Sequence, residues 1–117
     1  MATPSDRPLR ILHLTLASEH GGVSRYLYDL CSVMAKAGHQ PIIAGAKGAW
    51  HDLFENAPWP WLTIPIQGGV IANWQCKRQL LRELRSQRID IIHAHYRRSS
   101  MLGRKLARPL NAPLLFT

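Results

Sequence analysis

The sequence predicts an α/β protein: a Rossmann-like, doubly wound parallel sheet with helices on both faces. Short apolar runs that end at polar or glycine-containing turns alternate with longer segments whose apolar residues recur at helical spacing. Strands that alternate with helices favour a parallel sheet joined by right-handed crossovers. The chain has 117 residues, 46% of them hydrophobic, which suffices for one domain with a core but not for two of ordinary size. We therefore expect one domain over residues 9–117, after a flexible tail at residues 1–8.

The first half predicts a strand, a helix and two further strands. The run LRILHLTL at residues 9–16 is short and apolar and ends at a polar turn, which is typical of a buried strand. A helix is expected over residues 23–37, because its apolar residues share one face and Gly38 follows as a C-terminal stop. The runs QPIIAGA and WLTIPI predict strands at residues 40–46 and 61–66. The apolar face of the helix consists of Val23, Leu27, Leu30 and Met34.

The second half repeats this alternation. A helix over residues 72–87 is followed by the strand IDIIHAH at residues 89–95. Ser99 can cap the next helix, which the proline and asparagine within residues 109–111 end. The run APLLFT at residues 112–117 predicts a fifth strand. The helix over residues 72–87 is expected to bury Trp74, Leu80, Leu81 and Leu84.

The formal net charge of +8 is the strongest deviation in composition. Much of it lies in CKRQLLRELRSQR, where five basic residues accompany a single acidic one, Glu83. Such a stripe can attract nucleic acid, anionic lipid head groups or a phosphorylated substrate, and it can equally be a solvated outer helix face. No aromatic residues interleave with the charges and no reader motif accompanies them, so we expect no nucleic-acid partner. The basic residues are Lys77, Arg78, Arg82, Arg85 and Arg88.

The terminus and the cysteines bear on the cellular compartment. The N-terminal MATPSDRP lacks the basic-then-apolar order of a signal peptide, so we expect a cytoplasmic protein. No apolar stretch approaches the roughly 18 to 20 residues of a spanning helix. Membrane contact is therefore expected to be peripheral, at the inner face of the cytoplasmic membrane. Cys31 and Cys76 lack CxxC spacing, which favours two reduced, buried thiols over a disulfide or a zinc site.

Two adjacent glycines, Gly21 and Gly22, lie between the first predicted strand and the first predicted helix. In a doubly wound sheet, ligands bind beyond the carboxyl ends of the strands, where the strand order reverses. A helix N-terminus presents unpaired N–H groups there, and residues without a Cβ let phosphate oxygens approach them. A turn that needs a positive φ angle explains the pair as well. The stretch GGVSRY is not a GxGxxG fingerprint, and GAKGAW lacks the GK[ST] of a phosphate loop.

Several short motifs occur in a characteristic order along the chain. A GG pair opens the first helix of HGGVSRYLYDLCSVMAKAGHQPIIAG, and a GH pair ends it. In IDIIHAHYRRSSMLGRKLARPLNAPLLFT, a D-[IV]-[IV]-H-x-H strand end precedes a helix and an apolar P-x-x-x-T strand. In this order and spacing the chain resembles the N-terminal domain of GT-B glycosyltransferases, in particular the retaining family 4 type. The resemblance covers nearly the whole chain from Leu9 onward.

The resemblance implies one half of a two-domain enzyme. The nucleotide-sugar donor would bind mainly to a C-terminal domain that this sequence does not include. The N-terminal domain would carry a glycan or lipid-linked acceptor, in cell-envelope polysaccharide or lipopolysaccharide synthesis. Residues 9–117 would be a partial acceptor-side domain, inactive alone and without a cofactor beyond the donor substrate. Gly21 and Gly22 would approach the donor diphosphate across the cleft.

The same resemblance suggests residues for the acceptor side of the cleft. His95 lies at the end of the predicted fourth strand, and Tyr96 and Arg97 follow it in an expected loop. Arginine gains nothing from the dipole at a helix N-terminus, so this loop can bind an anionic acceptor, or it can be a plain exposed loop. Glu19 and His20 precede the glycines and can contact the acceptor or the donor sugar, or form an ordinary polar loop.

The histidines leave a choice of roles. His93 and His95 are two residues apart on a strand and point to the same side. Imidazole is a common zinc ligand, but no carboxylate or thiolate cluster is evident nearby and the family generally works without a metal cofactor, so we expect no metal. A packing role or a cleft role is expected instead, and His13 is expected in the core. The alternative to a transferase is a non-catalytic Rossmann-like binding module whose basic face docks on a membrane or polyanion.

Overall fold

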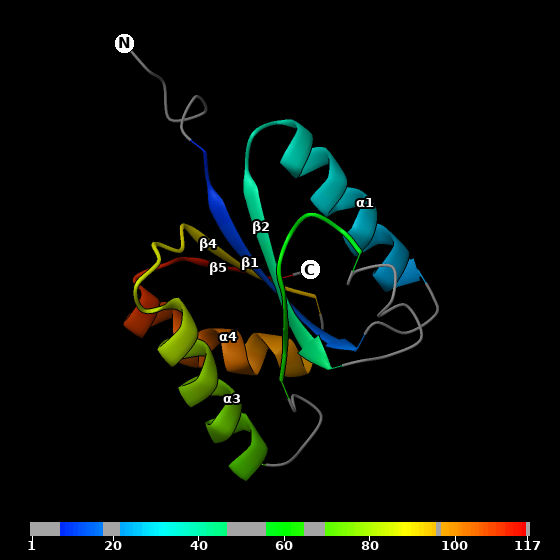
Figure 1. The fold of residues 1–117 in the computed structure, drawn as a ribbon. Coiled ribbons are helices and arrows are strands. Elements are labelled where there is room, and N and C mark those ends of the chain that lie inside the picture. Colours follow the sequence, from blue (N-terminus) through cyan, green and yellow to red (C-terminus); the bar gives the residue numbers. More distant parts are fainter. Residues whose placement is uncertain (1–7, 18–21, 47–55, 65–69, 96, 117) are drawn as a thin grey trace.

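The computed structural model describes residues 8–17, 22–46, 56–64, 70–95 and 97–116. In these residues strands alternate with helices, apart from two successive strands at 40–46 and 61–63, as the sequence predicts (Figure 1). The elements are β1 (Arg10–Ala17), α1 (Gly22–Lys36), β2 (Gln40–Ala46), β3 (Trp61–Thr63), α3 (Val70–Leu84), β4 (Ile91–Ala94), α4 (Arg97–Leu110) and β5 (Leu114–Phe116).

The five strands form one sheet in the order β3-β2-β1-β4-β5, and each neighbouring pair is parallel. β1 is central, since Leu12 pairs with Ile42 of β2 on one side and with Ile92 of β4 on the other. The chain leaves β1 towards β2 and β3 and then crosses back to β4 and β5. This reversal places the topological switch point of the sheet between β1 and β4.

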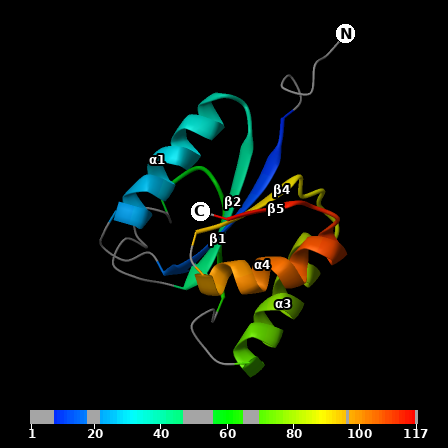
Figure 2. The ribbon, with the colours of Figure 1, turned by 180° about the vertical axis from the view of Figure 1, so that it is seen from behind.

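Helices cover both faces of the sheet, which confirms the predicted doubly wound architecture. α1 lies on one face, and α3 and α4 lie side by side on the other (Figures 1 and 2). Alternate residues of a strand point to opposite faces, so Leu12 packs towards α3 and α4, whereas His13 points towards the α1 face with its register partner Ile43. The core on the α3 and α4 side includes Leu12, Leu14, Ile92, Cys76, Leu80, Leu84, Leu102 and Leu106, and the core on the α1 side includes Leu27, Cys31, Ile43 and Trp59.

Two helices end in the same hydrogen-bonded motif. After α1, the N–H of His39 donates to the carbonyl of Met34, and Gly38 adopts a φ of 94°. After α4, the N–H of Ala112 donates to the carbonyl of Ala107, and Asn111 adopts a φ of 52°. Such 6→1 bonds around a left-handed residue are the Schellman motif, which satisfies carbonyls that the helix leaves unpaired. Gly38 and Asn111 therefore end these helices, as predicted, whereas Pro109, which was also expected to end the second one, lies inside α4.

The expected burial of Trp74 is wrong. Its side chain is 55% exposed, and the guanidinium of Arg78, one turn further along α3, lies 4.8 Å from the centre of its ring. The buried face of α3 is instead set by Cys76, Leu80 and Leu84 at intervals of four residues. Trp74 falls outside this stripe, on a side of the helix where its π face stacks with a cation that stays in water.

Candidate functional site

The carboxyl ends of β1 and β4 lie next to each other at the centre of the sheet. β1 ends at Ala17 and α1 begins at Gly22, whereas β4 ends at Ala94 and is followed by His95. The N–H of His95 donates to the carbonyl of Leu14 at 3.0 Å, which extends the contact between the two strands past the end of β4. The start of α1 and the end of β4 thus meet at the switch point, where open α/β sheets bind ligands.

Part of the predicted site lies in the described structure. Gly22 is the first residue of α1, His95 directly follows β4, and Arg97 is the first residue of α4. All three belong to the carboxyl edge of the sheet, on neighbouring connections. The predicted site residues outside the described part of the chain are Glu19, His20, Gly21 and Tyr96.

The structure corrects the expected position of Arg97. The sequence predicts Arg97 in a loop with Ser99 as the cap of the following helix, but α4 already begins at Arg97. The helix therefore includes Ser99 in its first turn. Ser can act as a cap only where the backbone is still outside the helix, and here the backbone becomes helical two residues earlier. Any role of Arg97 in binding is that of a helix N-terminal residue, not of a loop.

Three histidines come together beneath this edge. Nδ1 of His13 lies 3.0 Å from Nε2 of His95, within hydrogen-bond distance. The ring centres of His93 and His95 are 4.0 Å apart, and that of His13 is 5.3 Å from that of His93. Tyr26 of α1 approaches His95 edge-on, with a distance of 6.2 Å between the ring centres. All three histidines are buried, with His13 fully enclosed.

The strand register explains why the three rings meet. His13 of β1 is the direct register partner of His93 of β4. His93 and His95 are two residues apart, so the alternation of a strand sends both towards the same face as His13. The sequence alone indicates the pair His93 and His95 on one strand, whereas it predicts only a core position for His13. The signal that could have joined them is the strand order, because β1 and β4 are neighbours in a sheet of this type.

Burial keeps these rings uncharged at neutral pH. Desolvation, followed by repulsion from His95 and then from His93, lowers the pKa of His13 from 6.5 to about 3. Desolvation, followed by repulsion from His93, lowers the pKa of His95 to about 3, and desolvation also lowers the pKa of His93. A neutral imidazole has one N–H and one lone pair. The cluster can therefore hold a proton between two nitrogens, accept a hydrogen bond or bind a metal ion.

A comparison with protein-family models identifies the family of this chain. The sequence matches the family model of Glycosyltransferase Family 4 over residues 20–117. The chain belongs to glycosyltransferase family 4. The match includes α1, β4 and α4, the three elements that border the carboxyl edge. β1 and its His13 precede the matched region.

Solved structures share the fold of this family 4 chain. A crystal structure of a glycosyltransferase from Rickettsia africae superposes with a TM-score of 0.73 at 18% identity, over 93% of this chain and 29% of that one. The C-terminal domain of a hydrogenase from Pyrococcus furiosus superposes with a TM-score of 0.68 at 11% identity, over 93% of this chain and 91% of that domain. No curated protein gives a significant match. The present chain thus spans less than a third of the length of the Rickettsia enzyme.

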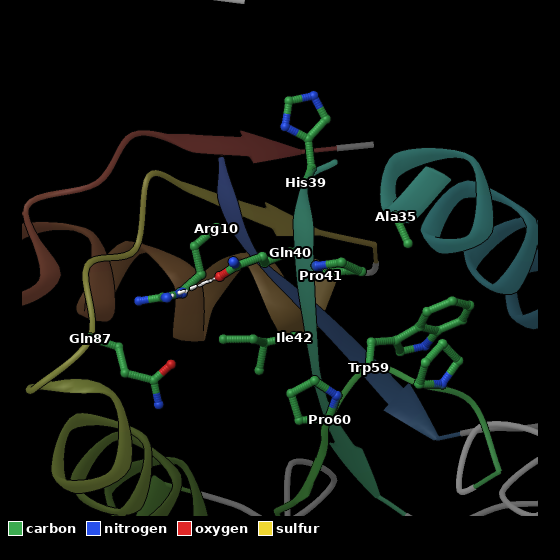
Figure 3. Close-up of a pocket in the computed structure, with 10 residues that line it drawn as sticks. Arg10, Ala35, His39, Gln40, Pro41, Ile42, Trp59, Pro60 and Gln87 are labelled. Atoms are coloured by element: carbon green, nitrogen blue, oxygen red, sulfur yellow. Dashed lines mark hydrogen bonds between the residues drawn. The ribbon is translucent and has the colours of Figure 1, made fainter. Parts of the chain in front are cut away.

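A hollow of about 300 Å³ lies at the opposite, amino edge of the sheet. Figure 3 shows its polar wall, where Arg10 donates to the side-chain oxygen of Gln40, and its apolar wall around Trp59 and Pro60. Both Arg10 and Gln40 are the first residues of their strands. Because ligands of doubly wound sheets bind at the carboxyl edge, this hollow is not the expected place for a sugar donor.

The basic stripe predicted from the sequence begins on the outer side of α3 and continues past its end at Leu84. Arg78, Arg82 and Arg85 are exposed and, with Leu81, line a shallow hollow of about 450 Å³. Their charges are available to a partner in solution, while Leu81 packs against the core beneath them. In the described part of the chain, every helix is too short or too polar to span a membrane.

Proposed function

We propose that this chain is the acceptor-side part of a retaining glycosyltransferase, which moves a sugar from a nucleotide-sugar donor to a glycan or lipid-linked acceptor. The observation that carries the proposal is the family 4 match, which spans the elements around the switch point of the sheet. The donor-binding domain lies outside this chain in the proposal, in keeping with its coverage of 29% of the Rickettsia glycosyltransferase. Retaining transfer needs that domain to hold the leaving diphosphate, so residues 1–117 alone are expected to be inactive.

The proposed contribution of this chain to donor binding is the N-terminus of α1. The first turn of a helix has N–H groups without intrahelical partners and the positive end of the helix dipole. Gly22 opens α1 next to the end of β1, and the absence of a Cβ leaves room for a phosphate oxygen to approach. Hydrogen bonds from these N–H groups would stabilise the negative charge that develops on the leaving diphosphate.

The proposed acceptor side lies on the neighbouring connection. His95 directly follows β4 and Arg97 is the first residue of α4, so the two residues lie two positions apart in the chain. A neutral imidazole can exchange a hydrogen bond with a sugar hydroxyl, and a guanidinium can pair with an anionic acceptor group. Glu19, His20, Gly21 and Tyr96 complete the proposed site, which would face the cytoplasm and serve cell-envelope glycan synthesis.

Gly22→Val in the enzyme that contains its donor-binding domain tests the proposal. The added branches should hinder the diphosphate, so turnover should fall on the order of 100-fold, as for a lost oxyanion-type contact. The thermal midpoint should fall only modestly, because Gly22 is the first residue of α1 and helix ends fray. Turnover would be measured with radiolabelled nucleotide sugars, and thermal unfolding would be followed on the same preparation.

Gly38→Ala is the matched control. Gly38 has a φ of 94° and open space around the position of a Cβ, so this substitution strains the backbone without filling a site. It should lower stability by about 1 kcal/mol and leave activity per folded molecule near normal. If Gly22→Val behaves like Gly38→Ala, destabilised but fully active, the role assigned to Gly22 is wrong.

A second candidate function rests on the exposed arginines of α3 and of the turn that follows it. The side chains of Arg78, Arg82 and Arg85 would dock this face on anionic lipid head groups, which attract juxtaposed basic residues with about 1 kcal/mol each. Co-sedimentation with phosphatidylserine vesicles tests this role. Arg82→Glu with Arg85→Glu should abolish binding, whereas Arg104→Glu on α4 should leave it nearly unchanged. Equal binding of all variants, or equal binding to phosphatidylcholine vesicles, contradicts docking through α3.

A further inference from the structure

The cluster below the switch point consists of three buried histidines, His13, His93 and His95. One nitrogen from each of His13, His93 and His95 lies within 4.8 Å of the others, and all three side chains are buried. Of the described residues, only histidines form this group. Nε2 of His13 has no hydrogen-bond partner within the described structure, although it is fully enclosed. Buried polar atoms are nearly always satisfied, so this one indicates a missing partner.

The backbone that holds the three rings is rigid. β1 is hydrogen-bonded on both sides, to β2 and to β4, so His13 is fixed in the middle of the sheet. His93 lies in β4 between β1 and β5, and the N–H of His95 is bound to the carbonyl of Leu14. Ligands on the strands of a scaffold hold their geometry better than ligands on loops. The rings can therefore converge on one point without a change in the sheet.

The chemistry of three imidazoles selects one class of ligand. Imidazole nitrogen suits zinc and related transition metals, whereas magnesium and calcium require oxygen ligands. Three protein ligands with an open fourth position form the arrangement of zinc sites that keep a water or a substrate group on the metal. We propose that His13, His93 and His95 form a three-histidine site for a divalent transition metal ion of the zinc type.

The distances suit this site after small movements of the rings. Zinc–nitrogen bonds of about 2.0–2.1 Å at tetrahedral angles separate two ligand nitrogens by roughly 3.3 Å. His13 Nδ1 and His95 Nε2 are 3.0 Å apart, and one nitrogen from each of the three rings lies within 4.8 Å of the others. An ion bound between Nδ1 of His13 and Nε2 of His95 replaces the hydrogen bond of that pair. The alternative is an ion bound through Nε2 of His13, which supplies the partner that this atom lacks.

Metal binding by the three histidines does not depend on the proposed function, although His95 belongs to both sites. His13 lies before the region that matches the family, so the site combines a residue outside the match with two residues inside it. It also departs from the expectation of a metal-free protein, which came from the family resemblance. Metal binding can be measured without any sugar donor or acceptor, and its failure leaves the proposed transferase untouched.

Zinc chloride titrated into the chelator-treated full chain tests the site by isothermal titration calorimetry. We expect a single strong site per chain. His93→Gln should weaken binding by at least 10- to 100-fold, the loss known for residues that merely support a metal ligand. His39→Gln is the matched control, because His39 lies at the amino edge of the sheet with its Nδ1 bound to the N–H of Leu9, and it should bind zinc like the parent chain.

Cobalt(II) keeps the test decisive if His93→Gln does not fold. In the parent chain, the absorption of bound cobalt distinguishes a tetrahedral site with nitrogen ligands from an octahedral surface site, and competition with zinc should remove it. Tetrahedral absorption at one equivalent supports the site. Failure to bind either ion, octahedral absorption, or a folded His93→Gln that binds zinc with unchanged affinity overturns the proposal.

Discussion

Asp90 and Arg10 exchange two hydrogen bonds at the amino edge of the sheet. The carboxylate Oδ2 of Asp90 accepts from the N–H of Arg10, and the N–H of Asp90 donates to the carbonyl of Arg10, both at 2.8 Å. The side chain of Asp90 is 9% exposed, and its other oxygen lies 3.2 Å from Nε of Arg88. The aspartate of the DIIHAH motif thus ties the approach of β4 to the start of β1, ahead of the register that pairs His93 with His13.

Asp90→Ala should destabilise the chain by about 1–3 kcal/mol, because it leaves the N–H of Arg10 without its acceptor in a partly buried position. Asp90→Asn keeps an oxygen there and should lose less. Urea unfolding of both variants measures the difference. The exposed Arg88 contributes little, so Arg88→Ala should change stability by less than about 1 kcal/mol. An Ala variant as stable as the parent would show that Asp90 does not hold the two strands together.

Gly103 marks a close approach of α4 to the sheet. A Cβ at this position would lie 2.7 Å from Cδ1 of Leu114, 3.5 Å from Cδ1 of Leu14 and 3.6 Å from Cγ2 of Ile92. Only the flexible end of Leu114 must move for one added carbon, and alanine gains about 1 kcal/mol of helix propensity over glycine. Gly103→Ala should therefore change the free energy of unfolding by less than about 1 kcal/mol.

Gly103→Val extends the same test to a larger side chain. Its branches must also displace Leu14 and Ile92 in the core, so a loss of about 1–3 kcal/mol is expected from overpacking. Leu114→Ala should recover part of that loss in the double variant, because it removes the nearest obstacle. Chemical denaturation of the single and double variants measures the coupling. If the stability losses of Gly103→Val and Leu114→Ala simply add in the double variant, the valine does not clash with Leu114.

The two cysteines should be inert in the folded chain. Both are fully buried, and burial raises the pKa of Cys31 to about 12 and also raises the pKa of Cys76. The thiolate is the reactive form, so a disulfide reagent at pH 8 should label neither residue until denaturant is added. Val33→Cys supplies the positive control, because Val33 is 64% exposed on α1 and its replacement should react at once. Rapid labelling of the native parent chain would contradict the burial of these thiols.

Most of the fold can be predicted from the sequence, because the spacing of the hydrophobic residues shows where the strands and helices lie. The bounds of β1, α1 and β2 lie within one residue of those expected, since each has a clear apolar pattern and α1 has Gly38 as its stop. The start of α4 was misplaced because Ser99 is a good cap in isolation, and sequence gives no backbone angle by which to reject it. Trp74 was misplaced because hydrophobicity alone does not show that a neighbouring arginine offers its ring a partner in water.

The candidate site was less predictable because it depends on contacts between distant strands. His93 and His95 are recognisable as a pair from their spacing, but His13 joins them only through the pairing of β1 with β4. The close approach at Gly103 likewise depends on the position of Leu114 in β5. Of the residues predicted at the carboxyl edge, the structure describes Gly22, His95 and Arg97, and their functional roles stay predictions.

The buried histidines predict that the metal-free chain loses stability in mild acid. The groups that face one another are His13, His93 and His95 on the strands and the ring of Tyr26 on α1. Burial lowers the pKa of His13 and of His95 to about 3, whereas histidines of the unfolded chain titrate near 6.5. Between these values the unfolded chain binds protons that the folded chain does not, so the folded state loses stability as the pH falls.

The expected slope gives this prediction a measurable form. Each of the two rings should remove up to about 1.4 kcal/mol of stability per pH unit below pH 6.5, and the loss should continue down to about pH 3. Above pH 7 both rings are neutral in either state, so their contribution to the slope should vanish.

His13→Leu removes one of the two titrating rings. Below pH 6.5, the free energy of unfolding of this variant should therefore fall less steeply with decreasing pH, by about the contribution of one ring. Urea unfolding between pH 4 and 8 in the presence of a chelator measures both slopes. Equal slopes for the parent and His13→Leu would mean that His13 is protonated in the folded chain, and the neutral cluster described above would then be wrong.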